Sequence, residues 1–146
     1  MGVLALLATC GYPFIRAEWS YRGIKDEYLL RQGRYDAIVQ ILAKQGLAPD
    51  TRHYFFIRRD RDPASLRPLG PNELDGPRYD FYKQACLIEA YWESDGRLVA
   101  FFVTGDLGAM AGAQGLVYSV AAPRQGQFGL GGRHDKIGTN WWSVWH

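Results

Sequence analysis

Three polar residues in the second half of the chain have side chains of the kinds used in acid–base catalysis. They are Asp106, His134 and Asp135, and each lies in or beside a glycine-rich segment. An enzyme would need these side chains to meet in a cleft, with the two glycine-rich loops bringing them together. This gives the third-ranked hypothesis, an enzyme whose active site has no recognised motif.

The other patterns that carry chemistry are missing from the sequence. A phosphate-binding P-loop needs a Gly-Lys-Ser/Thr unit, which does not occur, and the glycines at 129–132 have no helix pattern after them. The histidines His53, His134 and His146 are far apart and lack metal-ligand spacing. Glu89 and Glu93 fit a solvated strand face. We therefore expect no catalytic residues, no cofactor and no metal.

Aromatic residues are the more informative group, at 14% of the chain. Several lie on expected strands, and alternating strands bury both faces only when both faces are covered. An exposed aromatic patch marks a binding surface. The alternative is that the helix and a long loop cover one face, and a dimer or the N-terminal segment covers the other. The candidate binding surface consists of Tyr91, Phe102, Trp141, Trp142 and Trp145.

Length and charge limit the class of protein. A chain of 146 residues predicts one domain. Seventeen basic and fifteen acidic residues leave a net charge of +2, too balanced to indicate nucleic-acid binding. No apolar run approaches the ~20 residues of an ordinary membrane-spanning helix. The partner is therefore expected to be a protein, not a nucleic acid.

The elements that must position these residues begin with a helix. Apolar residues at Tyr35, Ile38, Val39, Ile41 and Leu42 have helical spacing within Asp26–Gln45, and Gly46 follows as a C-cap. Gly33 breaks the pattern, so residues 25–32 form a separate helix or an extended segment in the alternative interpretation. Residues 11–24 show no clear periodicity, which predicts an irregular segment.

Strand patterns follow the helix. Residues 53–59, 84–93, 97–104, 116–121 and 137–146 are predicted strands, and residues 60–80, 105–115 and 122–135 are predicted loops. No β-α-β alternation appears. The expected fold is α+β, an antiparallel β-meander of four or more strands with one N-terminal helix, or two, packed on one face.

The hairpin at residues 84–104 gives the sharpest local prediction. A two-residue Asp95-Gly96 loop favours a type I′ turn. Pairing outward from that loop sets Trp92 opposite Val99, Ala90 opposite Phe101, and Ile88 opposite Val103. These six apolar residues would share the core face of the sheet.

The N-terminal residues give a prediction for where the protein is located in the cell. Val3–Ala8 has the length of a signal-peptide apolar region, and Leu7-Ala8-Thr9-Cys10 resembles the lipobox of bacterial prolipoproteins. The segment differs from that pattern at Thr9 and in having no Lys or Arg before the apolar run. The resemblance implies cleavage before Cys10 and lipid attachment there, with residues 1–10 as the signal segment and 11–146 as the domain. In the alternative interpretation Val3–Ala8 and Cys10 belong to the core.

These observations favour a non-enzymatic binding protein on the periplasmic side of the cell envelope. Inhibitors, immunity proteins and envelope accessory factors act through surface complementarity and need no motif. The membrane contact would be the lipid on Cys10 alone. The second hypothesis is a cytoplasmic toxin-neutralising protein or assembly subunit, and a homodimer is compatible with either.

Overall fold

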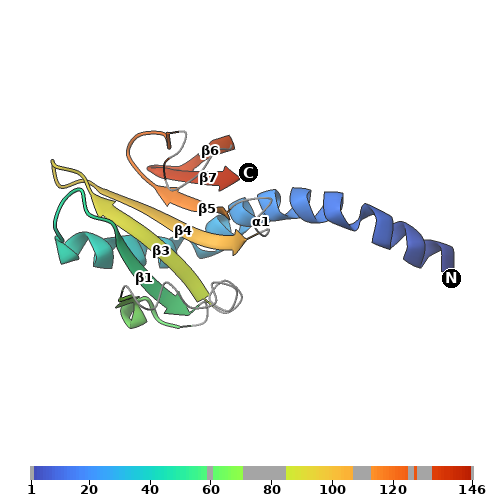
Figure 1. Ribbon diagram of the computed structural model, residues 1–146, viewed down its shortest axis with the longest axis horizontal. Helices are drawn as coiled ribbons and strands as arrows, with labels where there is room; N and C mark the ends of the chain where they lie inside the picture. Colours follow the sequence, from blue (N-terminus) through green and yellow to red (C-terminus); the bar gives the residue numbers. More distant parts are fainter. Residues whose placement is uncertain are drawn as a thin grey trace.

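In the part of the chain that the structure describes, one α-helix and one antiparallel sheet form two layers. The computed structural model describes residues 2–58, 61–70, 85–106, 113–124, 127 and 133–145, and it describes the side chains of the helix from Gly23 onward. Helix α1 (Gly2–Gln45) crosses one face of a seven-stranded sheet, and its N-terminal half runs out past the sheet (Figure 1). This arrangement confirms the predicted α+β class.

All strand pairs are antiparallel. The sheet order is β2-β1-β3-β4-β5-β7-β6, so the first two strands and the last two strands each exchange places relative to a simple meander. The predicted loop at 60–80 contains the short 3-10 helix η1 (Pro63–Ser65) and an edge strand, and its residues 71–80 lie outside the described part of the chain. The strands are β1 (His53–Arg58), β2 (Arg67–Pro68), β3 (Ala85–Trp92), β4 (Leu98–Asp106), β5 (Ala113–Tyr118), β6 (Arg133–Gly138) and β7 (Trp141–Trp145).

Helix α1 is longer than its sequence pattern predicts. The irregular segment expected at residues 11–24 is wrong, because α1 is helical from Gly2. The predicted break near Gly33 is present as a kink at Arg31, whose φ of −126° and ψ of 26° are not helical. Gly46 has a φ of +55°, which confirms the predicted glycine C-cap.

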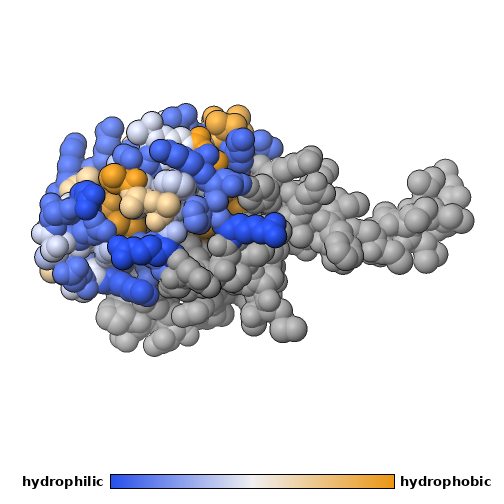
Figure 2. Space-filling model, turned by 90° about the horizontal axis from the view of Figure 1, so that it is seen from above, coloured by the Kyte–Doolittle hydropathy of each residue, from blue (hydrophilic) through white to orange (hydrophobic). Residues whose placement is uncertain are grey.

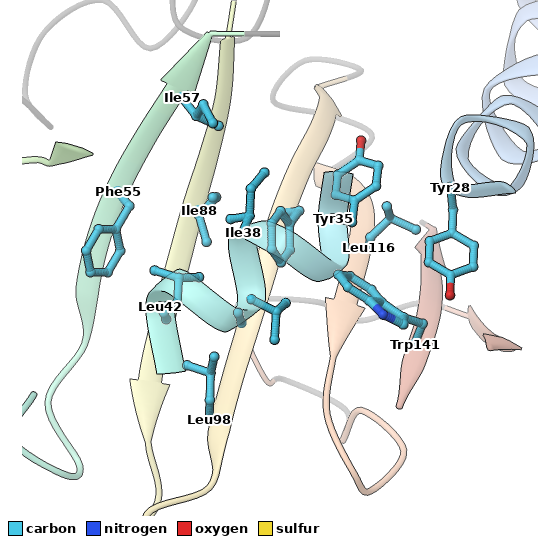
Figure 3. Packing of buried hydrophobic residues seen from close by; sticks show 14 of the residues in the cluster. Tyr28, Tyr35, Ile38, Leu42, Phe55, Ile57, Ile88, Leu98, Leu116 and Trp141 are labelled. Atoms are coloured by element: carbon cyan, nitrogen blue, oxygen red, sulfur yellow. The ribbon is translucent and has the colours of Figure 1, made fainter. Parts of the chain in front are cut away.

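The main core lies between α1 and the sheet (Figure 3). Tyr35, Ile38, Val39 and Leu42 are buried as the helical spacing predicts. The ring of Trp141 has neighbours on the helix and on strands β4 and β5, and its Nε1 donates to Asp36 Oδ1 on α1 at 2.9 Å. The cluster is completed by Ile24, Tyr28, Phe55, Ile57, Ile88, Ala90, Trp92, Leu98, Ala100, Phe102 and Leu116.

The register predicted for the β3–β4 hairpin is wrong by one residue. The loop has three residues, Ser94 to Gly96, because the Glu93 N–H donates to the Arg97 carbonyl and Trp92 pairs with Leu98. Gly96 has a φ of +88°, and Asp95 is not among the residues with positive φ, which does not fit a type I′ turn.

This shift exchanges the two faces of β4. Leu98, Ala100 and Phe102 join the core under α1, while Val99, Phe101 and Val103 lie on the other side of the sheet.

The C-terminal strand prediction is also corrected. Residues 137–146 do not form the single strand that their pattern predicts, because β6 and β7 form a hairpin that turns at Thr139 and Asn140, where Asn140 has a φ of 63°. Asparagine tolerates this left-handed conformation better than most residues. Val120, which the pattern places on a strand face, lies beyond β5 and is 54% exposed.

The sheet face away from α1, which we call the outer face, has a second buried cluster of Val99, Phe101, Val103, Val117 and Val144. The segment after β5 makes hydrogen bonds to both β7 and β3 on this face. At its start the Trp142 Nε1 donates to the Ser119 carbonyl at 3.0 Å. Further along, the Gln127 side chain donates to the Tyr91 hydroxyl on β3, and Pro123 between them is buried.

Candidate functional site

The structure separates the five aromatic residues of the predicted binding surface. Trp141 and Phe102 are buried in the core under α1 and cannot belong to an exposed patch. Tyr91 and Trp142 lie on the outer face and are partly exposed. Trp145 belongs to β7, but its side chain lies outside the described residues. The outer face therefore holds the part of the predicted surface that a partner could reach.

Trp142 is the centre of a small aromatic and basic site at the β6 edge. The Lys136 Nζ lies 5.6 Å from the centre of its ring, and the His134 ring packs edge-on at 5.7 Å. Both neighbours come from β6 and are exposed. Their positions alternate with Asp135 along the strand, so His134 and Lys136 share the outer face. An indole fixed by its N–H bond and flanked by a lysine ammonium and an imidazole suits recognition of an acidic or aromatic group.

Glu89 is the charged residue set into the outer face on β3. The strand register places Tyr54 of β1 and Phe101 of β4 on either side of it. Its Oε1 lies 3.0 Å from Nη1 of Arg52, an ion pair whose angles are not those of an aligned hydrogen bond. Burial raises the pKa of the Glu89 carboxyl, and the Arg52 charge opposes this rise without cancelling it.

The residues proposed for catalysis do not form a cluster. His134 and Asp135 are successive residues of the edge strand β6, so their positions face opposite sides of the sheet. Asp106 ends β4, which is separated from β6 by β5 and β7. Within the described ranges, no group of three His, Cys, Asp or Glu residues is placed to hold a metal ion.

Several other expectations fall on segments without described positions. Residues 107–112, the glycines at 129–132 and His146 belong to these segments.

The remaining residues that the sequence singled out have described positions. Glu93 pairs with Arg97 at the hairpin, so Glu89 and Glu93 each have a separate arginine neighbour. Cys10 lies within α1, and Cys86 pairs in register with Ile57. A search of the described helices finds none long and apolar enough to cross a membrane.

Sequence reasoning missed the partners of these side chains. Arg52 stands before β1 with no pattern linking it to Glu89, and Gln127 stands 36 residues after Tyr91. The alternation of residues along β6 (Arg133–Gly138) is the pattern that could have placed His134 and Lys136 on one face. The glycines before this strand instead favour a loop over residues 122–135, so the prediction missed the start of β6.

Comparisons with known proteins give no relative for this chain. No family model matches it, and no match is found among curated proteins or solved structures. Its function must therefore be inferred from the residues and their geometry.

The surface seen from the β6 side is mainly hydrophilic, with hydrophobic residues in small separate spots (Figure 2). Anchoring side chains of protein interfaces are often aromatic or basic, and Trp142 with Lys136 has that composition.

Proposed function

We propose that this chain is a non-catalytic binding protein, held at the cell envelope by a lipid on Cys10, that recognises a protein partner through the outer face of its sheet. The observation that carries the proposal is the division of α1. The N-terminal half of the helix runs out past the sheet (Figure 1). We call residues 2–22 of α1 the arm.

The arm places Cys10 away from the folded core. At ~1.5 Å per residue, a helix puts Cys10 about 21 Å before Ile24. A lipid at that position would tether the domain and leave the outer face accessible to a partner. Acyl chains anchor a protein by burying methylene groups at ~0.8 kcal/mol each.

Pro13 supports cleavage before Cys10. A proline inside a continuous helix costs about 3 kcal/mol, because it removes one backbone hydrogen bond and clashes with the preceding turn. In a chain that begins at Cys10, Pro13 belongs to the first helical turn, where its missing N–H is no loss. The proline is thus better tolerated in the processed chain than in the uncleaved one.

The test is the intact mass of the native protein extracted from the membranes of its own host. We expect a chain that lacks residues 1–9 and carries added acyl mass, and a Cys10→Ala variant that carries none. A soluble protein with residues 1–146 intact would overturn the lipid anchor.

Partner binding is tested separately, by placing a photo-crosslinking amino acid at Lys136, beside Trp142. We expect a discrete cross-linked product in the host envelope, and loss of that product when Trp142 is also changed to alanine. The control position is Lys44, which is exposed in the last turn of α1. Equal products from both positions would contradict a specific surface at the β6 edge.

A further inference from the structure

A group of arginines lies at the edge of the sheet opposite β6, where β1 pairs with β2 (Figure 1). β1 ends at Arg58, and the Arg61 N–H donates to the Arg58 carbonyl at 3.2 Å, so the chain turns there. Arg34 of α1 holds this turn, because its guanidinium donates to the Arg58 carbonyl at 2.8 Å and to the Arg61 carbonyl. Arg67 of β2 pairs in register with Phe56 of β1. We call Arg34, Arg58, Arg61 and Arg67 the arginine cluster.

The cluster extends onto the outer face, the side of the sheet that the proposed partner binds. Phe55 of β1 is buried under α1, so the alternate residues Tyr54, Phe56 and Arg58 lie on the outer face. The Arg67 guanidinium carbon lies 5.1 Å from the centre of the Phe56 ring. Both aromatic side chains of this face are partly exposed, and both arginines are exposed. β1 and β2 therefore present basic and aromatic side chains together.

The described residues give the cluster little negative charge. Among them, no carboxylate forms an ion pair with Arg58 or Arg61. Asp62 is the acidic residue next to the turn, and its Oδ1 accepts a backbone N–H of η1 at 2.8 Å as the helix cap. Residues 59–60 lie outside the described part of the chain and carry opposite charges. Guanidinium groups gathered in this way repel one another, and an anionic ligand would relieve that repulsion.

The neighbouring side chains favour an acidic protein segment over a nucleic acid. Single-stranded nucleic acids bind through bases stacked on aromatic rings along a basic groove. Here the Phe56 ring has Arg67 beside it. Tyr54 lies in register with Glu89, whose carboxylate pairs with Arg52, so the basic charge of β1 is concentrated at its C-terminal end. Carboxylates match the planar fork of arginine, and apolar groups of the same segment can pack on the two rings.

We propose that the arginine cluster and the Tyr54 and Phe56 rings form a second contact on the outer face, which binds an acidic segment of the protein partner. Carboxylates of the segment pair with Arg58 and Arg61, and Arg34 is a positioning residue that holds the turn. The inference rests on the proposed function for the existence of a partner. It adds the chemistry of that partner, a segment of Asp and Glu side chains with apolar residues among them.

The first experiment measures the binding of a fluorescein-labelled peptide of alternating glutamate and tyrosine to the full chain by fluorescence anisotropy. Arg58→Glu with Arg61→Glu should weaken binding at least about fivefold, because two attractive contacts become repulsive. The control, Lys25→Glu with Lys44→Glu, changes the net charge equally at two exposed positions of α1. It should leave the affinity within about twofold at physiological salt, since distant exposed charges are screened.

Equal weakening by the two double variants would overturn the inference, because net charge alone would then explain the binding. Oligothymidylate of the same charge that bound as tightly as the peptide would overturn an acidic protein segment as the occupant. Thermal unfolding shows whether each variant is folded. Arg58→Gln with Arg61→Gln, which adds no carboxylate, should rank between the native chain and the reversed variant and replaces that variant if it does not fold.

The second experiment places a photo-crosslinking amino acid at Ala64 of η1, an exposed position beside the cluster, in the protein's own host. We expect mass spectrometry to identify an acidic cross-linked segment, and Arg58→Glu with Arg61→Glu to remove this product while one at Lys136 remains. A product at Lys136 with none at Ala64, or a basic cross-linked segment, would overturn the inference and leave the proposed function intact. No product at either position would overturn the proposed partner, and specific binding of the acidic peptide would still support the site.

Discussion

Glu89 shows how one carboxyl group responds to a mostly apolar sheet face. Burial among Tyr54 and Phe101 disfavours its charged form, and the exposed Arg52 compensates only in part. The pKa of Glu89 is therefore higher in the folded protein than in the unfolded chain. Between these two values the folded state holds more protons, so the free energy of unfolding falls as the pH rises.

This sign gives a prediction for Glu89→Gln, because glutamine cannot ionise. We expect the free energy of unfolding of the variant, relative to the native chain, to increase as the pH is raised from about 4 to about 7. Urea unfolding at several pH values measures this difference. Arg52→Ala should have the opposite effect, since loss of the guanidinium raises the Glu89 pKa further. A native chain that gained stability over Glu89→Gln with rising pH would show that the ion pair outweighs burial.

At the scale of elements, local signals predict the position of a strand better than its register. The aromatic and β-branched run at His53–Arg58 and the helical stripe ending at Gly46 are both recognisable, because they depend on spacing within one segment. The register of β3 and β4 depends on whether the loop holds two residues or three. Asp95-Gly96 fits both, and β4 is apolar at every position from Leu98 to Val103, so hydrophobicity does not distinguish its faces.

The candidate site is harder to predict than the fold for the same reason. Trp141 and Trp142 are neighbours in sequence, and only the pairing of β7 decides that the first faces α1 and the second faces outward. Arg52 with Glu89 and Gln127 with Tyr91 are contacts between distant segments. No periodicity within either segment encodes such contacts.

Two glycines in different elements should respond oppositely to alanine. Gly96 has a φ of +88°, which an L side chain rarely adopts, so Gly96→Ala should destabilise the fold by about 1–2 kcal/mol. Gly33 lies in α1 with no positive φ and with open space where an added Cβ would lie, so Gly33→Ala should stabilise the fold by about 0.5–1 kcal/mol. Urea unfolding of both variants checks the signs, and destabilisation by Gly33→Ala would mean that the kink at Arg31 needs the glycine.

At the scale of the whole molecule, both edges of the sheet are unsuited to pairing with another chain. β2 has only two residues and includes Pro68, while β6 has exposed polar side chains at four successive positions, three of them charged. Short strands, proline and charge are the usual means of discouraging edge-to-edge association. These features favour contacts through side chains on the outer face over extension of the sheet.

The division of α1 between arm and core leads to the last prediction, made with two N-terminal truncations. Removing residues 1–22 deletes the part of α1 that runs out past the sheet (Figure 1). We expect this truncation to unfold at nearly the same urea concentration as the full chain. Removing residues 1–28 also deletes Ile24 and Tyr28, which are 4% and 1% exposed, and should cost about 3–5 kcal/mol. Equal destabilisation by both truncations would show that the arm supports the domain, and would count against an arm that serves only to carry the lipid on Cys10.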